Sequence, residues 1–170
     1  VGGIVEQTPA YFETLATEIS ANVSVPVYLA EHLARPILAQ CAAAFDPVME
    51  LKGNSRTTCP LCGNEPLMAL LSDEGEGKRL LHSSLCHTRW EFPRMTCCFC
   101  RNEQEGGMRY LHYEGDDVYR ANVCDACKRY LKCIDERNCG GRTVVLQVEA
   151  LVTANLDEMA LERDYLRTAG

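Results

Sequence analysis

The first fifty residues show apolar side chains at a spacing of four, which predicts α-helices. Thr8-Pro9 supplies an N-cap followed by a proline in the first helical turn, and Pro36 is expected to kink or divide a later segment. The apolar positions of the two series are Tyr11, Leu15 and Ile19, then Leu29, Leu33, Ile37, Cys41 and Phe45. We therefore expect residues 1–52 to form a helical segment that packs on the rest, with Cys41 in the core.

From residue 52 to residue 140 the apolar runs become short and alternate with turn sequences, a pattern typical of β-hairpins. Gly53-Asn54, Gly63-Asn64 and Gly106-Gly107 are examples of these turns. The runs with strand character are Leu67–Leu71, Arg79–His82, Met108–Tyr113 and Asp117–Val123. This zone has little room for long helices.

Helical spacing returns over residues 143–167. Val145, Val148, Val152, Leu156 and Met159 would share one face, with acidic side chains opposite. An amphipathic helix that docks on the hairpin zone through this face is the expectation for residues 141–170.

The composition is that of an ordinary globular protein. The chain has 170 residues, of which 46% are apolar and 24% charged, enough to bury a real core. A net charge of −7 argues against tight binding to nucleic acid or an anionic membrane. No apolar run approaches the length needed to span a bilayer, and no N-terminal signal is recognisable. We expect neither nucleic acid nor a membrane as partner.

The eleven cysteines are the most informative feature of the composition. Ten lie in the hairpin zone, and six of these form three pairs with two residues between the cysteines. With no secretory signal, such pairs indicate metal ligation and not a disulfide framework. Because metal thiolates need a reducing compartment, a cytoplasmic location is expected.

The hairpin zone repeats itself. When its first half is aligned with its second, Cys59 and Cys62 fall on Cys97 and Cys100, and Cys86 falls on Cys124. The second unit has the spacing C-x2-C-x23-C-x2-C, a strong signal for a tetrahedral four-thiolate site. The predicted ligands are Cys97, Cys100, Cys124 and Cys127.

The first unit offers only Cys59, Cys62 and Cys86. His82 and His87 flank Cys86, and three cysteines with one histidine form a normal structural zinc set. The alternative is a site that has lost its metal and is held by side-chain packing. The chain is therefore expected to hold one or two ions of zinc or iron.

Two further groups of residues belong to the prediction. Cys98 must point away from the second site, and Cys133 and Cys139 are interpreted as buried or surface thiols outside both sites. Trp90, Arg94, Tyr130 and Lys132 lie beside the cysteine pairs and are candidates for partner contact.

Several motifs together resemble the formate dehydrogenase accessory protein FdhE family. They are CPLCGNEP at 59–66, LHSSLCHTRW at 81–90, CCFC at 97–100 and CDACKRYLK at 124–132. The family has a cysteine where this chain has Ser83, an acid at Arg89 and a histidine at Glu91. The resemblance implies a cytoplasmic assembly factor that binds the catalytic subunit of a formate dehydrogenase, with mainly structural zinc or iron in rubredoxin-like sites.

The overall prediction is an α+β protein with tandem rubredoxin-like or zinc-ribbon hairpin modules between terminal helices. The expected divisions are residues 1–52, 53–96, 97–140 and 141–170.

Two other functions compete with the accessory role. A rubredoxin-like iron site could transfer electrons. A nucleic-acid-binding zinc ribbon is less favoured, because residues 56–137 hold 12 basic and 13 acidic side chains. No nucleophile–base pair or phosphate loop is recognisable, so no enzymatic activity is expected.

Overall fold

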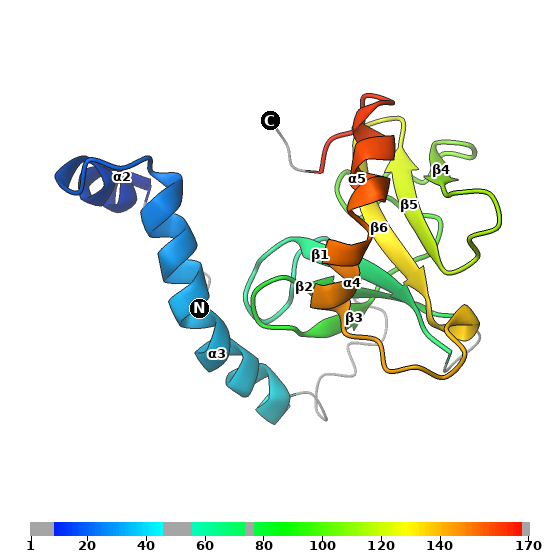
Figure 1. The fold of residues 1–170 in the computed structure, drawn as a ribbon, viewed down its shortest axis with the longest axis horizontal. Helices are drawn as coiled ribbons and strands as arrows, with labels where there is room; N and C mark the ends of the chain where they lie inside the picture. Colours follow the sequence, from blue (N-terminus) through cyan, green and yellow to red (C-terminus); the bar gives the residue numbers. More distant parts are fainter. Residues whose placement is uncertain (1–8, 46–55, 74–76, 168–170) are drawn as a thin grey trace.

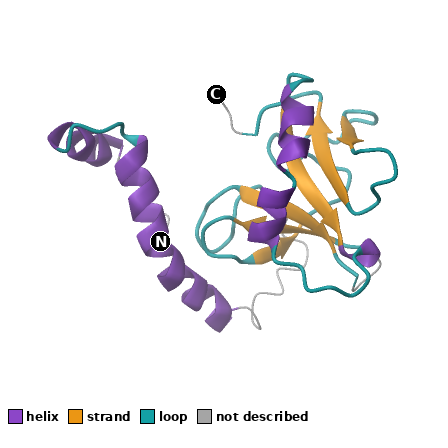
Figure 2. Ribbon diagram, in the orientation of Figure 1, coloured by secondary structure: helices purple, strands orange, loops and turns teal. Residues whose placement is uncertain are grey.

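One six-stranded sheet forms the centre of the computed structural model, which describes residues 9–45, 56–73 and 77–167 (Figure 2). Helices stand at both ends of the chain, as expected for an α+β protein. The strands are β1 (Pro66–Leu71), β2 (Arg79–Ser83), β3 (Arg89–Glu91), β4 (Met108–Leu111), β5 (Tyr119–Cys124) and β6 (Arg129–Asp135). The four predicted strands correspond to β1, β2, β4 and β5, whereas β3 and β6 were not predicted.

The strand order shows how the two halves of the hairpin zone are joined. The order is β3-β2-β1-β6-β5-β4, so each half contributes three neighbouring strands. A parallel pairing between β1 and β6 joins them, with Ala69 opposite Cys133 and Leu71 opposite Asp135. The halves therefore share one continuous sheet, where the sequence had suggested tandem hairpin modules.

Both faces of the central strands are buried. On β1, Met68 and Leu70 pack toward the C-terminal helices, while Ala69 and Leu71 face a second core that also contains Trp90. This arrangement explains the unbroken apolar run of β1, because a strand covered on both faces has no polar face to alternate.

The N-terminal helices stand beside the sheet, and the expected burial of their apolar stripe was wrong. Helix α2 (Pro9–Glu18) precedes α3 (Ser24–Phe45), which continues as one helix through Pro36 (Figure 1). Leu33 is 75% exposed, and Cys41 is exposed and not in the core. Within the described part of α3, Leu38 and Ala42 are the apolar side chains that join the second core.

The large apolar residues exposed along α2, α3 and the turn between them are Tyr11, Ile19, Val23, Val25, Tyr28, Leu29, Leu33 and Ile37. No helix in the described ranges is both long and apolar enough to cross a membrane.

Two short helices replace the single C-terminal helix that was predicted. Helix α4 (Leu146–Val152) and helix α5 (Ala154–Leu161) cross one face of the sheet (Figure 1). Their buried face consists of Leu146, Glu149, Thr153, Leu156, Met159 and Ala160. The predicted face was therefore wrong at Val145, Val148 and Val152, which are exposed.

Buried polar groups account for that difference. Glu149 accepts hydrogen bonds from Arg142 and from the hydroxyl of Tyr119, the latter over 2.6 Å. Lys132 of β6 donates to the carbonyl of Ala150, at the end of α4, over 2.6 Å. The spacing of apolar residues cannot predict which helix face is buried when charged side chains make its contacts.

Candidate metal centres

Four turns of the same backbone shape surround the cysteines. We call them knuckles 1 to 4, starting at Cys59, Ser83, Cys97 and Cys124. In knuckles 1 to 3 the backbone N–H of the first residue donates a hydrogen bond to the carbonyl oxygen of the residue five positions later, over 2.8 to 3.0 Å. The fifth residue of each knuckle has a positive φ: 79° at Gly63, 63° at His87, 60° at Arg101 and 54° at Lys128. A knuckle therefore exists at Ser83 although a cysteine is missing there.

Knuckles 3 and 4 bring together the four cysteines of the predicted second site. The sulfur atoms of Cys97, Cys100, Cys124 and Cys127, here cluster 2, all lie within 4.8 Å of one another. The Sγ–Sγ distances are 3.7 Å both for Cys97–Cys127 and for Cys100–Cys124. Zn–S bonds of about 2.3 Å in a tetrahedron require edges of about 3.8 Å, so the donor set fits zinc or iron.

Three thiols of cluster 2 have pKa values that are shifted in different directions. Burial raises the pKa of Cys97 and Cys127. Burial also acts to raise the pKa of Cys124, but the backbone N–H groups of Cys127 and Ala126 and the neighbouring thiols outweigh it, and the pKa is lowered. Cys124 is therefore easier to deprotonate than Cys97 or Cys127, and a bound cation would supply charge that favours the thiolate form of every ligand.

Knuckles 1 and 2 assemble the three cysteines of the first unit. The sulfur atoms of Cys59, Cys62 and Cys86, here cluster 1, lie within 4.8 Å of one another, and all three residues are buried. The Cys59–Cys86 Sγ–Sγ distance is 3.4 Å, the spacing of a hydrogen-bonded thiol pair. Hydrogen bonds with Cys62 and Cys86 raise the pKa of Cys59, while those from Cys59 and Cys62 lower the pKa of Cys86.

Neither candidate histidine joins cluster 1. His82 lies between Leu81, which packs with the cysteines, and Ser83, so strand alternation turns His82 to the other face. There its Nε2 is 3.2 Å from the amide nitrogen of Gln147 on α4. His87 occupies the turn position that Gly63 fills in knuckle 1, and its pKa is lowered by burial and then by the nearby charge of Arg35.

The fourth corner is filled by Ser83, which the family resemblance marked as the position of a missing cysteine, although a histidine was expected as the fourth ligand. Ser83 is fully buried, and its Oγ lies 3.2 Å from Cys62 Sγ. The alignment of the two halves had placed Cys86 on Cys124, but Cys86 is the fourth residue of its knuckle and corresponds to Cys127. A slightly larger offset between the halves superposes Ser83 and Cys86 on Cys124 and Cys127, in agreement with the family resemblance.

The remaining predicted residues are mostly part of the core. Cys98 packs with the second core, and burial raises its pKa to about 12. Trp90, Tyr130 and Lys132 are also buried, so their side chains present no surface to a partner. Of the four contact candidates, Arg94 alone is exposed.

Cys133 and Cys139 are both buried, and neither belongs to the two cysteine groups found among the described residues.

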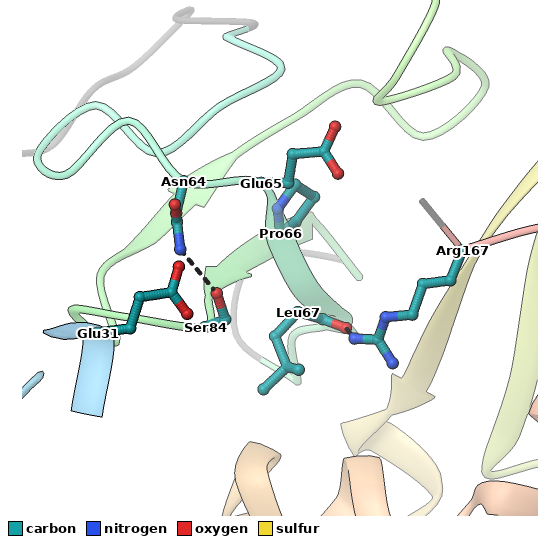
Figure 3. A pocket seen from close by; sticks show the side chains of 7 residues that line it. All are labelled: Glu31, Asn64, Glu65, Pro66, Leu67, Ser84 and Arg167. Atoms are coloured by element: carbon teal, nitrogen blue, oxygen red, sulfur yellow. Dashed lines mark hydrogen bonds between the residues drawn. The ribbon is translucent and has the colours of Figure 1, made fainter. Parts of the chain in front are cut away.

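A pocket of about 350 Å³ lies next to cluster 1, between Glu31 of α3, the end of knuckle 1 and Arg167 (Figure 3). On its wall the Asn64 side chain donates to Ser84 Oγ over 3.2 Å, which ties knuckle 1 to knuckle 2. Arg167 donates to the carbonyl of Leu67 over 2.6 Å. These polar contacts stabilise the backbone around cluster 1.

Comparison with known proteins gives the family. Residues 58–94 match the model described as FdhE, central domain. An FdhE homolog of Aquifex aeolicus is 31% identical over 111 residues, which cover 64% of this chain and 38% of that protein. The crystal structure of the FdhE protein from Pseudomonas aeruginosa superposes with a TM-score of 0.59 at 27% identity, covering 80% of this chain. The chain belongs to the FdhE family.

The FdhE similarity is confined to part of each relative. An FdhE homolog of Stutzerimonas stutzeri is 32% identical over 118 residues, which cover 67% of this chain but 37% of the relative. The match covers 50% of the Pseudomonas aeruginosa chain. This FdhE chain thus spans well under half the length of the curated relatives that it matches.

The knuckle geometry of this FdhE chain makes a prediction at Gly63. With φ of 79° and no atom within 4 Å of an added Cβ, Gly63→Ala should cost only the left-handed backbone penalty, about 1–2 kcal/mol. Chemical denaturation of metal-loaded protein measures this cost. Gly63→Asn is the matched control and should lose less, since asparagine tolerates this conformation. An alanine variant that unfolds at the parent's denaturant concentration would contradict the assignment of strain.

Proposed function

We propose that this chain is the metal-binding part of a cytoplasmic accessory factor that binds the catalytic subunit of a formate dehydrogenase during maturation. Membership of the FdhE family carries this proposal. Zinc or iron would hold the knuckles together, and the chain itself would catalyse no reaction.

The arrangement of cluster 2 supports a structural role for its metal. Cys97 and Cys100 lie before β4, Cys124 is the last residue of β5, and Cys127 lies in the turn that joins β5 to β6. An ion in this position would link three strands at one edge of the sheet. A client would then meet a rigid surface, which lowers the entropic cost of binding.

The test is retention of a purified formate dehydrogenase catalytic subunit on the immobilised, metal-loaded chain under anaerobic conditions. We expect the parent to retain the subunit and the double variant Cys97→Ser/Cys124→Ser to lose it. Cys41→Ser is the matched control, because Cys41 is exposed and outside both clusters. A parent that carries its metal and retains no more subunit than the bare matrix would contradict the proposed client.

Electron transfer is the second candidate, and one observation favours it. Cys100 is exposed, so an iron ion in cluster 2 would lie close to the protein surface, where electrons could enter and leave. Purification in iron-containing medium decides between the two. A red protein with reversible reduction would support the carrier, and a colourless protein with bound zinc would exclude it.

A further inference from the structure

The fourth corner of cluster 1 is an oxygen held in a place built for a sulfur. Ser83 begins knuckle 2 in the position where a cysteine begins each of the other three knuckles. It has no exposed surface, and its Oγ faces Cys62 Sγ over 3.2 Å. Across the same cluster, Cys59 Sγ faces Cys86 Sγ over 3.4 Å. The three sulfurs and the Ser83 oxygen thus form two opposed pairs, and the Thr88 hydroxyl contacts Cys86 Sγ over 3.1 Å.

The hydrogen bonds to Ser83 match those to a knuckle sulfur. The backbone N–H groups of Leu85 and Cys86 point at Ser83 Oγ over 3.2 and 3.3 Å. In knuckle 3 the N–H of Phe99, also two residues after the start, points at Cys97 Sγ over 3.4 Å. Backbone donors of the kind that support a metal-bound thiolate therefore support the serine oxygen here.

We propose that Ser83 Oγ is the fourth ligand of cluster 1 and that this oxygen makes the cluster an exchangeable metal site. Zinc accepts oxygen as well as sulfur ligands. A serine hydroxyl is a weaker donor than a thiolate, so cluster 1 binds its ion less tightly than cluster 2 does. The inference rests on the metal-binding part of the proposed function and is independent of the client.

The experiment counts zinc ions while a chelator of known affinity is added to the fully loaded chain. The parent should release one ion readily and keep the other. Ser83→Ala should weaken the first ion by at least about tenfold, since even outer-shell partners of a metal are worth 10–100-fold. Ser83→Cys should complete a four-thiolate set and tighten that ion by at least a similar factor.

Ser84→Cys is the matched control, because it adds a thiol one residue away, where the side chain bonds Asn64 and not the cluster. It should not tighten the first ion as Ser83→Cys does, because its thiol does not reach cluster 1. Circular dichroism of each variant identifies any that fail to fold, and Cys86→Ser then provides a second variant of the same cluster.

Three results would overturn the proposal: unchanged affinity in Ser83→Ala, a parent that binds one ion while Ser83→Cys binds two, or equal effects of the two added cysteines. If the chain did not bind metal as proposed, the chelator titration would give another result, because cluster 2 would then release its ion as readily as cluster 1.

Discussion

Replacing Cys124 by serine is expected to unfold the half of the sheet that contains β4, β5 and β6. A structural zinc supplies about 10–16 kcal/mol of apparent binding free energy at neutral pH. The net stability of a whole domain is about 5–15 kcal/mol, so losing the ion removes most of it. The measurement is thermal unfolding followed by circular dichroism, with the metal content of the same sample.

The control for this variant separates loss of metal from loss of a thiol. Cys139→Ser changes a buried cysteine outside both clusters and should keep the full metal content. Removing the metal from the parent with a chelator should reproduce the behaviour of Cys124→Ser. A Cys124→Ser protein that unfolds at the parent's temperature would show that cluster 2 does not stabilise the fold.

Replacing Lys132 by methionine is expected to cost about 3–5 kcal/mol, the range for removing one partner of a buried ion pair. The Lys132 side chain is 0% exposed, and its Nζ lies 2.6 Å from an Asp157 carboxylate oxygen. It also donates to the carbonyl groups of Ala150 and Thr153, where α4 gives way to α5. Loss of these bonds should release both helices from the sheet, which amide hydrogen exchange over residues 146–161 would detect.

An exposed lysine provides the comparison. Lys128 pairs with Asp125 over 3.1 Å with a side chain that is 58% exposed, so Lys128→Met should cost less than about 1 kcal/mol. The double variant Lys132→Met/Asp157→Leu should recover part of the loss, because it removes the unpaired carboxylate. Equal effects of the two lysine substitutions would contradict an anchoring role for Lys132.

The sequence predicted the elements whose signals are local. Strands β1 and β2 are apolar runs bounded by turns, and the cysteine spacing alone indicated cluster 2. Strand β6 was missed although it lies at the centre of the sheet, since Lys132 interrupts its apolar pattern. Its charge is satisfied by groups 18 to 25 residues away, which no local pattern can show.

For cluster 1 the family resemblance marked Ser83 as the place of the missing cysteine, but a histidine was expected to take its role. A histidine next to three cysteines is a familiar donor, and serine is not. Which side chain reaches the cluster depends on strand alternation and on the positive φ at His87. The backbone shape of knuckle 2, and not the type of residue, identifies Ser83 as the residue at the fourth corner of cluster 1.

The parallel seam between β1 and β6 also has a consequence for synthesis of the chain. Leu71 leaves the ribosome long before its partner Asp135, because all the other strands of the sheet are made between them. At about 5–20 residues per second, the growing chain waits about 3 to 13 seconds for the partner strand. During that interval β1, a wholly apolar strand, has one edge without hydrogen-bond partners, the condition in which strands aggregate. Until β6 is made, the nascent chain therefore carries an aggregation-prone strand edge that the finished sheet hides.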